Sequence, residues 1–234
     1  MENVLYHVKN AVLRRGSVSD GFAIQVSELR LAPAELVAVL GPSGCGKSTL
    51  LDALGLVLRP AAAEIFEIDL GDGRLFSALH RQDEGKLLNI RRRHLGYVLQ
   101  SGGLIASMSV RENILTAVQF SEARLERERY STLVDRLGLA PLLQRRPREL
   151  SGGQRQRVAI ARALVHGPKL VLADEPTAAI DHRLTQEVCD TLRSCAKDLG
   201  SAVVMVTHNR DLAAAFADRT INLEDGINSP VSRL

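Results

Sequence analysis

The sequence has no tryptophan, and aromatic residues make up only 3% of it. A chain of 234 residues is long enough to bury a sizeable core, so that core must be built from aliphatic side chains. No stretch approaches the ~18 uninterrupted apolar residues that a membrane-spanning helix needs. The N-terminus, MENVLYHVKN, has no apolar signal region. We therefore expect a protein that neither spans a membrane nor is exported.

Cysteine and net charge are also scarce. Cys45, Cys189 and Cys195 show no CxxC spacing and cannot all pair internally, which suits a reducing compartment. The net charge is only +3. Arginine clusters at 91–93 and 145–146 would suit phosphates or lipid head groups, but acidic residues nearly match the basic ones. A scattered, solvated basic face is the simpler interpretation, and we expect no nucleic-acid partner.

Three short apolar runs, at residues 36–40, 170–173 and 202–206, each lead into polar residues and then a helical pattern. Continuous apolar strands followed by helices indicate a parallel sheet covered on both faces. Residues 4–24 and 65–68 predict further strands. The fold class is therefore α/β.

The middle of the chain predicts helices instead. Residues 121–137 are charged and helical, with Gly138 as a stop, and residues 151–165 predict a second helix. We expect a helical subdomain over 101–165, inserted into an α/β core made of residues 1–100 and 166–234.

A glycine-rich loop follows the first apolar run and precedes a helix expected over residues 49–58. The pattern GxxxxGK[ST] in this setting is typical of a phosphate-binding loop rather than an ordinary glycine turn. Lys47 would bridge the β- and γ-phosphates, and the Ser48 hydroxyl would ligate Mg²⁺. The nucleotide-binding candidates here are Gly41, Pro42, Ser43, Gly44, Cys45, Gly46, Lys47, Ser48 and Thr49.

Polar side chains end the other two apolar runs. Asp174 and Glu175 follow one, and His208 follows the other. Taken alone, they could be solvated acids and a structural histidine. At the carboxyl edge of a parallel sheet beside a phosphate loop, they instead predict a metal ligand (Asp174), a residue that polarises water (Glu175) and a phosphate contact (His208).

The segment LSGGQ, residues 150–154, opens the second predicted helix with two glycines. Ser151 and Gln154 fit a capping box, but glycine within a helix costs about 1 kcal/mol relative to alanine. Capping alone therefore leaves Gly152 and Gly153 unexplained.

Taken together, these motifs resemble the nucleotide-binding subunit of ATP-binding cassette (ABC) transporters, in order and over nearly the whole chain. GPSGCGKST matches Walker A, Gln100 the Q-loop, LSGGQ the signature, LVLADE Walker B, Asp181 the D-loop and His208 the switch histidine. The resemblance implies a P-loop NTPase (RecA-like) core with a mostly parallel sheet, an N-terminal antiparallel β portion and an inserted helical subdomain.

The resemblance also implies a mechanism and partners. ATP and Mg²⁺ are the expected cofactors, with Ser48, Gln100 and Asp174 at the metal and Glu175, His208, Lys47 and Gln100 in catalysis. Two cassettes, identical or related, would pair head to tail. Ser151, Gly152, Gly153, Gln154 and Asp181 would then meet a nucleotide held by the other copy. A separate transmembrane permease would hold the pair on the cytoplasmic face of the membrane.

Details of the sequence refine this expectation. The motifs look most like the cassettes of lipoprotein-release, macrolide-efflux and cell-division permeases. An ABC-type regulator of a membrane partner in cell division, without transport, is the main alternative. A soluble ABC ATPase acting on DNA or ribosomes lacks its usual coiled coils or second cassette here, and a monomeric P-loop kinase leaves LSGGQ unexplained.

Two expectations concern the phosphate loop and its surroundings. The family's usual adenine-stacking aromatic is missing before the first glycine turn, where Leu13, Arg14 and Arg15 stand, with Tyr6 and Phe22 farther off. Adenine contact through an aliphatic side chain or an arginine plane is therefore expected. The Cys45 thiol is expected to be exposed and to react with maleimide.

Overall fold

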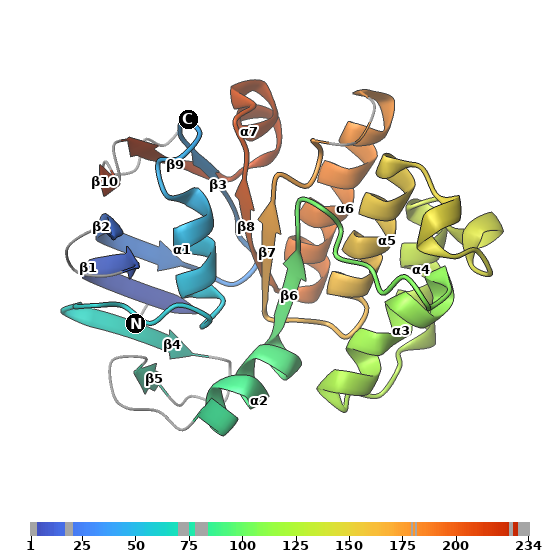
Figure 1. Ribbon diagram of the computed structural model, residues 1–234, viewed down its shortest axis with the longest axis horizontal. Coiled ribbons are helices and arrows are strands. Elements are labelled where there is room, and N and C mark those ends of the chain that lie inside the picture. The colour runs from blue at the N-terminus through green and yellow to red at the C-terminus, as the bar shows by residue number, and fades with distance from the viewer. Residues whose placement is uncertain are drawn as a thin grey trace.

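The computed structural model describes residues 4–16, 21–69, 75–77, 84–178, 180, 182–224 and 227–228. In this part of the chain, one mixed sheet has the strand order β5-β4-β1-β2-β10-β9-β3-β8-β7-β6, with helices on both sides (Figure 1). The strands are β1 (Tyr6–Arg15), β2 (Phe22–Leu31), β3 (Leu36–Leu40), β4 (Ile65–Asp69), β5 (Leu75–Ser77), β6 (Leu95–Val98), β7 (Leu170–Asp174), β8 (Ala202–Val206), β9 (Arg219–Glu224) and β10 (Ile227–Asn228). The helices are α1 (Lys47–Leu54), α2 (Glu84–His94), α3 (Val110–Ser121), α4 (Arg127–Arg136), α5 (Gly152–Leu164), α6 (His182–Leu199) and α7 (Arg210–Phe216).

The parallel half of the sheet explains the three apolar runs. β3, β8, β7 and β6 pair in parallel, and β9 pairs in parallel with β3. Along β3, Leu36 and Ala38 belong to one hydrophobic cluster, whereas Val37 and Val39 belong to the other. Because alternate side chains point to opposite faces, a strand covered on both sides must be apolar at every position.

The antiparallel half is formed mainly by the N-terminal strands. β1 pairs with both β2 and β4, and β5 extends this edge. β10 joins the two halves, because it pairs with β2 in parallel and with β9 in antiparallel orientation. α1 lies beside these strands in Figure 1, and its apolar side shares their hydrophobic cluster.

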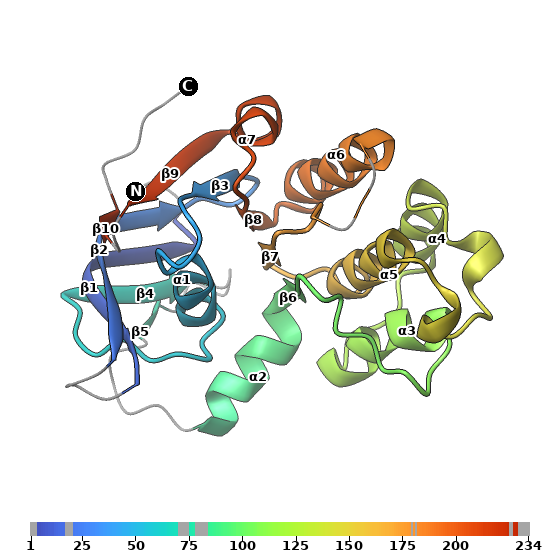
Figure 2. The same ribbon diagram turned by 45° about the horizontal axis from the view of Figure 1, so that its top comes forward.

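The remaining helices gather at the opposite side of the molecule. Figure 2 shows α3, α4 and α5 together as a group beyond β6 and β7, away from the N-terminal strands. They share one hydrophobic cluster with α6 and with one face of the parallel strands. These helices fall within the predicted subdomain 101–165, whose boundaries stay a prediction. None of the helices in the described ranges is long and apolar enough to cross a membrane.

The helix limits differ from the sequence expectation at two places. The helix expected over 49–58 ends at Leu54, and Leu56 takes a left-handed conformation with φ of 58°. The helix expected over 121–137 is wrong in its first turn, because Ser121 ends α3 and α4 begins only at Arg127. Glu122 at the end of α3 has φ of 56°, which stops the helix. Gly138, with φ of 59°, follows α4 as expected.

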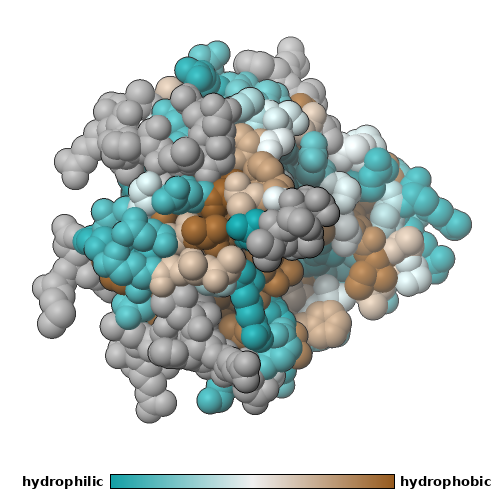
Figure 3. Space-filling view, turned by 60° about the vertical axis from the view of Figure 1, so that its left-hand side comes forward, coloured by the Kyte–Doolittle hydropathy of each residue, from teal (hydrophilic) through white to brown (hydrophobic). Residues whose placement is uncertain are grey.

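Figure 3 shows the face that lies on the left in Figure 1. Its hydrophobic residues form a group near the centre, with hydrophilic residues around them. The described residues of this face therefore present an apolar group at its centre.

Candidate nucleotide-binding site

The phosphate loop connects the end of β3 at Leu40 to the start of α1 at Lys47. Gly46 has φ of 103°, and a β-carbon there would lie 2.3 Å from Cγ2 of Ile24. Only glycine fits this position, where the backbone passes close to β2. Nζ of Lys47 donates to the carbonyl oxygens of Gly41 (2.8 Å) and Pro42 (2.7 Å). The ammonium group is thus held within the loop, above backbone amides and a helix N-terminus that suit an anion.

A cleft of about 420 Å³ opens over this loop. It brings together residues that end different strands: the Q-loop candidate follows β6, the acidic pair ends β7, and the histidine follows β8. The carboxyl edge of a parallel sheet is the usual ligand-binding edge of this kind of fold. The cleft is lined by Arg15, Phe22, Ser43, Gly44, Gly46, Lys47, Ser48, Thr49, Gln100, Asp174, Glu175 and His208.

Oxygen atoms suited to a hard cation meet at one point of the cleft. Oγ of Ser48 donates to Oδ2 of Asp174 at 3.1 Å. Burial raises the pKa of Asp174, the hydrogen bond from Ser48 lowers it, and the charge of Glu175 raises it further. A bound divalent cation would relieve this disfavoured charge. No group of three or more His, Cys, Asp or Glu side chains with metal-binding geometry occurs in the described part of the chain. Phosphate and water oxygens would have to complete a magnesium shell, as Mg²⁺ usually requires.

Glu175 is held next to His208. Oε1 of Glu175 lies 2.9 Å from Nδ1 of His208, and their side chains are 13% and 74% exposed. Glu175 takes a left-handed conformation with φ of 46°, while its backbone N–H donates to the carbonyl oxygen of Val206 at 3.0 Å. Such a conformation costs a non-glycine residue roughly 1–2 kcal/mol. The turn directs the carboxylate toward His208, which follows the neighbouring strand β8.

The LSGGQ segment lies outside this cleft. Oγ of Ser151 accepts from the N–H of Gln154 at 3.2 Å, and the N–H of Ser151 donates to Oε1 of Gln154 at 2.9 Å. The expected capping box is therefore confirmed. Within one chain, Gly152 and Gly153 do not line the cleft with Lys47. Asp181 lies outside the described residues.

Arg15, one of the arginines considered for the adenine contact, lines the cleft, and so does Phe22, which was expected to lie farther off. Arg15 and Phe22 are directly opposite in the β1–β2 pair, and Phe22 is 44% exposed. A β-carbon on Gly46 would lie 3.0 Å from Cε1 of Phe22, so the ring packs on the phosphate loop. Arg15 pairs with Asp52 of α1. Tyr6, in contrast, is fully buried and donates its hydroxyl to the carbonyl oxygen of Leu54 at 2.9 Å.

Comparison with known proteins agrees with this geometry. The family model described as ABC transporter matches residues 24–178, well over half of the chain. The chain belongs to the ABC transporter family. The expected family, its P-loop α/β fold and the ATPase class are thereby confirmed.

Similar proteins extend this assignment. The lipoprotein-releasing system ATP-binding protein LolD of Hyphomonas neptunium is 41% identical over 87% of this chain and 86% of its own length. The macrolide export ATP-binding/permease protein MacB of Wolinella succinogenes is 41% identical over 88% of this chain. The chain spans only 31% of that relative's length. A dimeric ATP-binding cassette, MJ0796 in a post-hydrolysis state with ADP and phosphate, has a TM-score of 0.85 at 30% identity, covering 98% of this chain and 99% of its own.

The cassette buries the cysteine of its phosphate loop. Cys45 is only 7% exposed, and a β-carbon on Gly41 would lie 2.6 Å from its sulfur. The expected exposure of this thiol is therefore wrong. The sulfur packs inward because it fills the space beneath the loop that Gly41 leaves open.

Cys45 is therefore expected to react slowly with maleimide in the native cassette and quickly after unfolding in urea. Mass spectrometry of labelled peptides measures both rates, and Cys45→Ser should keep normal ATP hydrolysis. Labelling of native Cys45 at the rate of the unfolded chain would contradict the burial.

Phe22 is expected to contact the nucleobase, since it is the exposed ring at the rim of the cleft. Stacking of a base on an aromatic ring contributes about 1–3 kcal/mol. Phe22→Ala should therefore raise the KM for ATP about 10-fold and leave kcat within about 2-fold, whereas Phe22→Tyr should behave as the parent. Steady-state kinetics measures both parameters, and an unchanged KM in Phe22→Ala would refute the contact.

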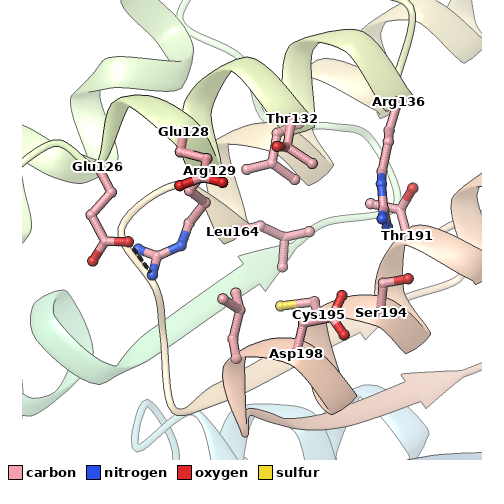
Figure 4. Close-up of a pocket in the computed structure, with 12 residues that line it drawn as sticks. Glu126, Glu128, Arg129, Thr132, Arg136, Leu164, Thr191, Ser194, Cys195 and Asp198 are labelled. Atoms are coloured by element: carbon pink, nitrogen blue, oxygen red, sulfur yellow. Dashed lines mark ion pairs between the residues drawn. The ribbon is translucent and has the colours of Figure 1, made fainter.

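A second cavity of about 350 Å³ lies between α4 and α6 (Figure 4). Glu126 and Arg129 form an ion pair of 2.8 Å at one end, and Leu164 and Cys195 lie among the lining residues. No phosphate-loop residue lines it. This cavity therefore belongs to the junction between the helical group and the core, not to the nucleotide cleft.

Proposed function

We propose that this cassette binds ATP with Mg²⁺, hydrolyses it between two cassettes and thereby drives a separate membrane permease. The observation that carries the proposal is the cleft itself. Lys47, Ser48, Asp174, Glu175 and His208 line one cleft, whereas the LSGGQ segment lies outside it. A second cassette would supply that segment.

Each residue of the cleft would have a separate role in the reaction. The ammonium group of Lys47 would release the carbonyl oxygens of its own loop and donate hydrogen bonds to phosphate oxygens instead. It would thereby neutralise charge that develops in the transition state. Ser48, Asp174 and Gln100 would hold Mg²⁺, which supplies further charge neutralisation when bound. Glu175 would accept a hydrogen bond from the attacking water and polarise it. His208 would orient Glu175 and contact the γ-phosphate.

The pairing of two cassettes is supported by structural likeness. The MJ0796 cassette, whose chain this one matches nearly end to end, is dimeric. In the described structure, the N-terminus of α5 and the glycines at 152 and 153 leave backbone N–H groups available to a phosphate. A head-to-tail pair would place these groups opposite Lys47 of the other copy. Asp181 would lie at the same interface.

A permease is supported by the similar proteins and by the surface. The MacB relative is named for ATP-binding and permease functions in one chain, and this chain matches 31% of its length. Exposed large hydrophobic side chains occur on α2, just after β6 and on α3, at Leu88, Leu99, Ile105 and Phe120. This side, next to Gln100, is where we place the permease contact. The cassette would lie on the cytoplasmic face of the membrane, held by the permease.

Transport of a lipoprotein or small-molecule cargo is favoured over regulation of cell division, because the similar proteins are named for lipoprotein release and macrolide export. The test is reconstitution of the cassette with its cognate permease in liposomes. ATP hydrolysis stimulated by the permease, with movement of cargo, is expected. Stimulated hydrolysis without cargo movement would favour the regulatory alternative. Absence of permease-dependent hydrolysis would refute the proposal.

A further inference from the structure

An acidic side chain of α1 lies beside the nucleotide cleft. Asp52 follows Ser48 by four residues on this helix, so the two side chains lie on the same side, about one turn apart. Oγ of Ser48 in turn donates to Oδ2 of Asp174. The carboxylate of Asp52 is therefore a neighbour of the two oxygens that would hold Mg²⁺, although Asp52 is not among the residues that line the cleft.

An arginine at the end of β1 offsets the charge of Asp52. The guanidinium of Arg15 forms an ion pair with Oδ2 of Asp52, and its Nη2 donates to the carbonyl oxygen of Ser48 at 3.5 Å. The side chains of Arg15 and Asp52 are 48% and 27% exposed. Because water reaches both groups, the pair contributes little to the stability of the fold. Its place next to the metal-binding oxygens suggests a role in binding instead.

A tyrosine of β6 lies between Asp52 and the metal-binding residues. The Tyr97 hydroxyl donates to Oδ1 of Asp52 at 3.3 Å. Burial raises the pKa of this hydroxyl, and the charges of Asp52 and Asp174 raise it further. Tyr97 therefore stays protonated, and both carboxylates are close enough to act on it.

The charge of Asp52 also acts on Asp174 itself. Burial raises the pKa of Asp174, the hydrogen bond from Ser48 lowers it, and the charges of Glu175 and Asp52 raise it further. Negative charge is thus concentrated at this point of the site. The same concentration attracts a divalent cation. Asp52 strengthens that attraction, and the positive charge of Arg15 reduces it.

We propose that Asp52 and Arg15 set the affinity of the cassette for Mg²⁺ from outside its coordination shell, the carboxylate strengthening the binding of the cation and the guanidinium weakening it. This inference rests on the proposed function, in which Ser48 and Asp174 hold Mg²⁺. Neither Asp52 nor Arg15 is assigned a contact with the cation. Both act through the charge that they place beside it.

The sign of the effects separates this role from that of a structural ion pair. Breaking a structural pair from either side disturbs the site in the same direction. Here the two substitutions must act in opposite directions. Asp52→Asn leaves the guanidinium unopposed and weakens Mg²⁺ binding, whereas Arg15→Gln leaves the carboxylate unopposed and strengthens it. Removal of both charges should bring the affinity back near that of the parent.

A second ion pair of β1 offers a matched control. Nζ of Lys9 donates to Oε1 of Glu64 at 2.6 Å, and both side chains are exposed. Lys9 precedes Arg15 by six residues, which is about 20 Å along a strand, and neither Lys9 nor Glu64 lines the cleft. Lys9→Gln and Glu64→Gln change the net charge of the cassette by the same amounts as the test variants. They should leave Mg²⁺ binding unchanged.

The experiment measures binding of adenylyl imidodiphosphate, a non-hydrolysable ATP analogue, to the full-length cassette by isothermal titration calorimetry, once in EDTA and once in Mg²⁺. The dissociation constant in EDTA divided by that in Mg²⁺ gives the contribution of the metal. A contact of Arg15 with the base cancels in this ratio, and the affinity of free nucleotide for Mg²⁺ is common to all variants. Titration of the nucleotide-saturated cassette with Mn²⁺, followed by electron paramagnetic resonance, measures the metal site independently.

The ratio should fall about 5-fold in Asp52→Asn and rise about 3-fold in Arg15→Gln, with Mn²⁺ affinity moving in the same directions. The double variant, the two control variants and the charge-conserving Arg15→Lys should stay within about 2-fold of the parent. Circular dichroism checks folding, and Asp52→Ser or Arg15→Met replaces a variant that does not fold.

A change in the same direction in both single variants, or no change in either, would overturn the inference. An effect of equal size in the Lys9 and Glu64 variants would overturn it too, because net charge alone would then explain the result. If the parent bound the analogue equally well with and without Mg²⁺, the metal site of the proposed function would be refuted, and the inference with it. A parent that needs Mg²⁺, with test variants that do not respond, would refute the inference alone.

Discussion

Glu175→Gln is expected to lower kcat for ATP hydrolysis about 100-fold or more and to leave the affinity for ATP within a few-fold. The amide keeps the shape of the side chain but loses the charge that polarises water, and general-base catalysis contributes typically 10²–10⁴-fold. Because hydrolysis would no longer separate the two copies, Mg-ATP should trap a pair that elutes early in size-exclusion chromatography. Phosphate release and fluorescent-nucleotide binding measure the two parameters.

The neighbour of Glu175 provides the control for this result. His208 contacts Glu175 at 2.9 Å but is itself largely exposed. His208→Ala should lower kcat less than Glu175→Gln if His208 mainly orients the carboxylate. Near-normal turnover of Glu175→Gln would remove Glu175 from the proposed reaction. Lost ATP binding in that variant would instead show a structural role at the strained turn after β7.

The strands and the phosphate loop were predictable from the sequence because their constraints are local. Burial on both faces forces an unbroken apolar run such as 36–40, and a loop that approaches β2 closely forces glycine at 46. The acidic pair at the end of β7 was predictable for the same reason. The last residues of every strand in a parallel sheet lie at its carboxyl edge, and this does not depend on contacts with distant parts of the chain.

The nucleobase side of the cleft depends on contacts distant in sequence. Phe22 reaches the cleft because β1 and β2 pair in a register that sets it opposite Arg15, and because Gly46 leaves space for its ring. Neither condition is visible in a window of sequence around Phe22. The burial of Cys45 was also not predictable from nearby sequence. Its position in a loop close to Lys47 predicted an exposed thiol, but the thiol packs against Gly41 and is buried.

The contact between α5 and the loop after β6 was equally hidden. Arg162 of α5 donates hydrogen bonds to the carbonyl oxygens of Gly102 and Gly103. In the sequence, Arg162 is one basic residue on an amphipathic helix, where a solvated arginine would be ordinary. Its partners are about 60 residues away, and their identity depends on how the loop after β6 turns through two left-handed glycines.

Ser151→Arg is expected to abolish ATP-driven association while the monomer keeps its affinity for ATP. In a head-to-tail pair, Ser151 would lie at the γ-phosphate of the other cassette, where an arginine side chain would occupy the space of the phosphate. Within its own chain, the residue is exposed and lies outside the cleft. Hydrolysis should therefore fall about 100-fold or more, because a monomer has an incomplete site. Light scattering with Mg-ATP and binding of a fluorescent nucleotide measure the two effects.

The substitution also removes a helix cap, so its effect must be separated from a loss of stability. Replacing a capping serine costs about 1 kcal/mol. α3 carries an equivalent cap that is not part of LSGGQ: Ser109 and Glu112 form the same reciprocal bonds, 3.2 Å and 2.7 Å long. Ser109→Arg should lower the melting temperature to a similar extent yet leave ATP-driven association intact. If Ser109→Arg also prevented association, lost capping would explain both variants. If Ser151→Arg weakened ATP binding by the monomer, LSGGQ would act on the nucleotide of its own chain, and the head-to-tail pair would be wrong.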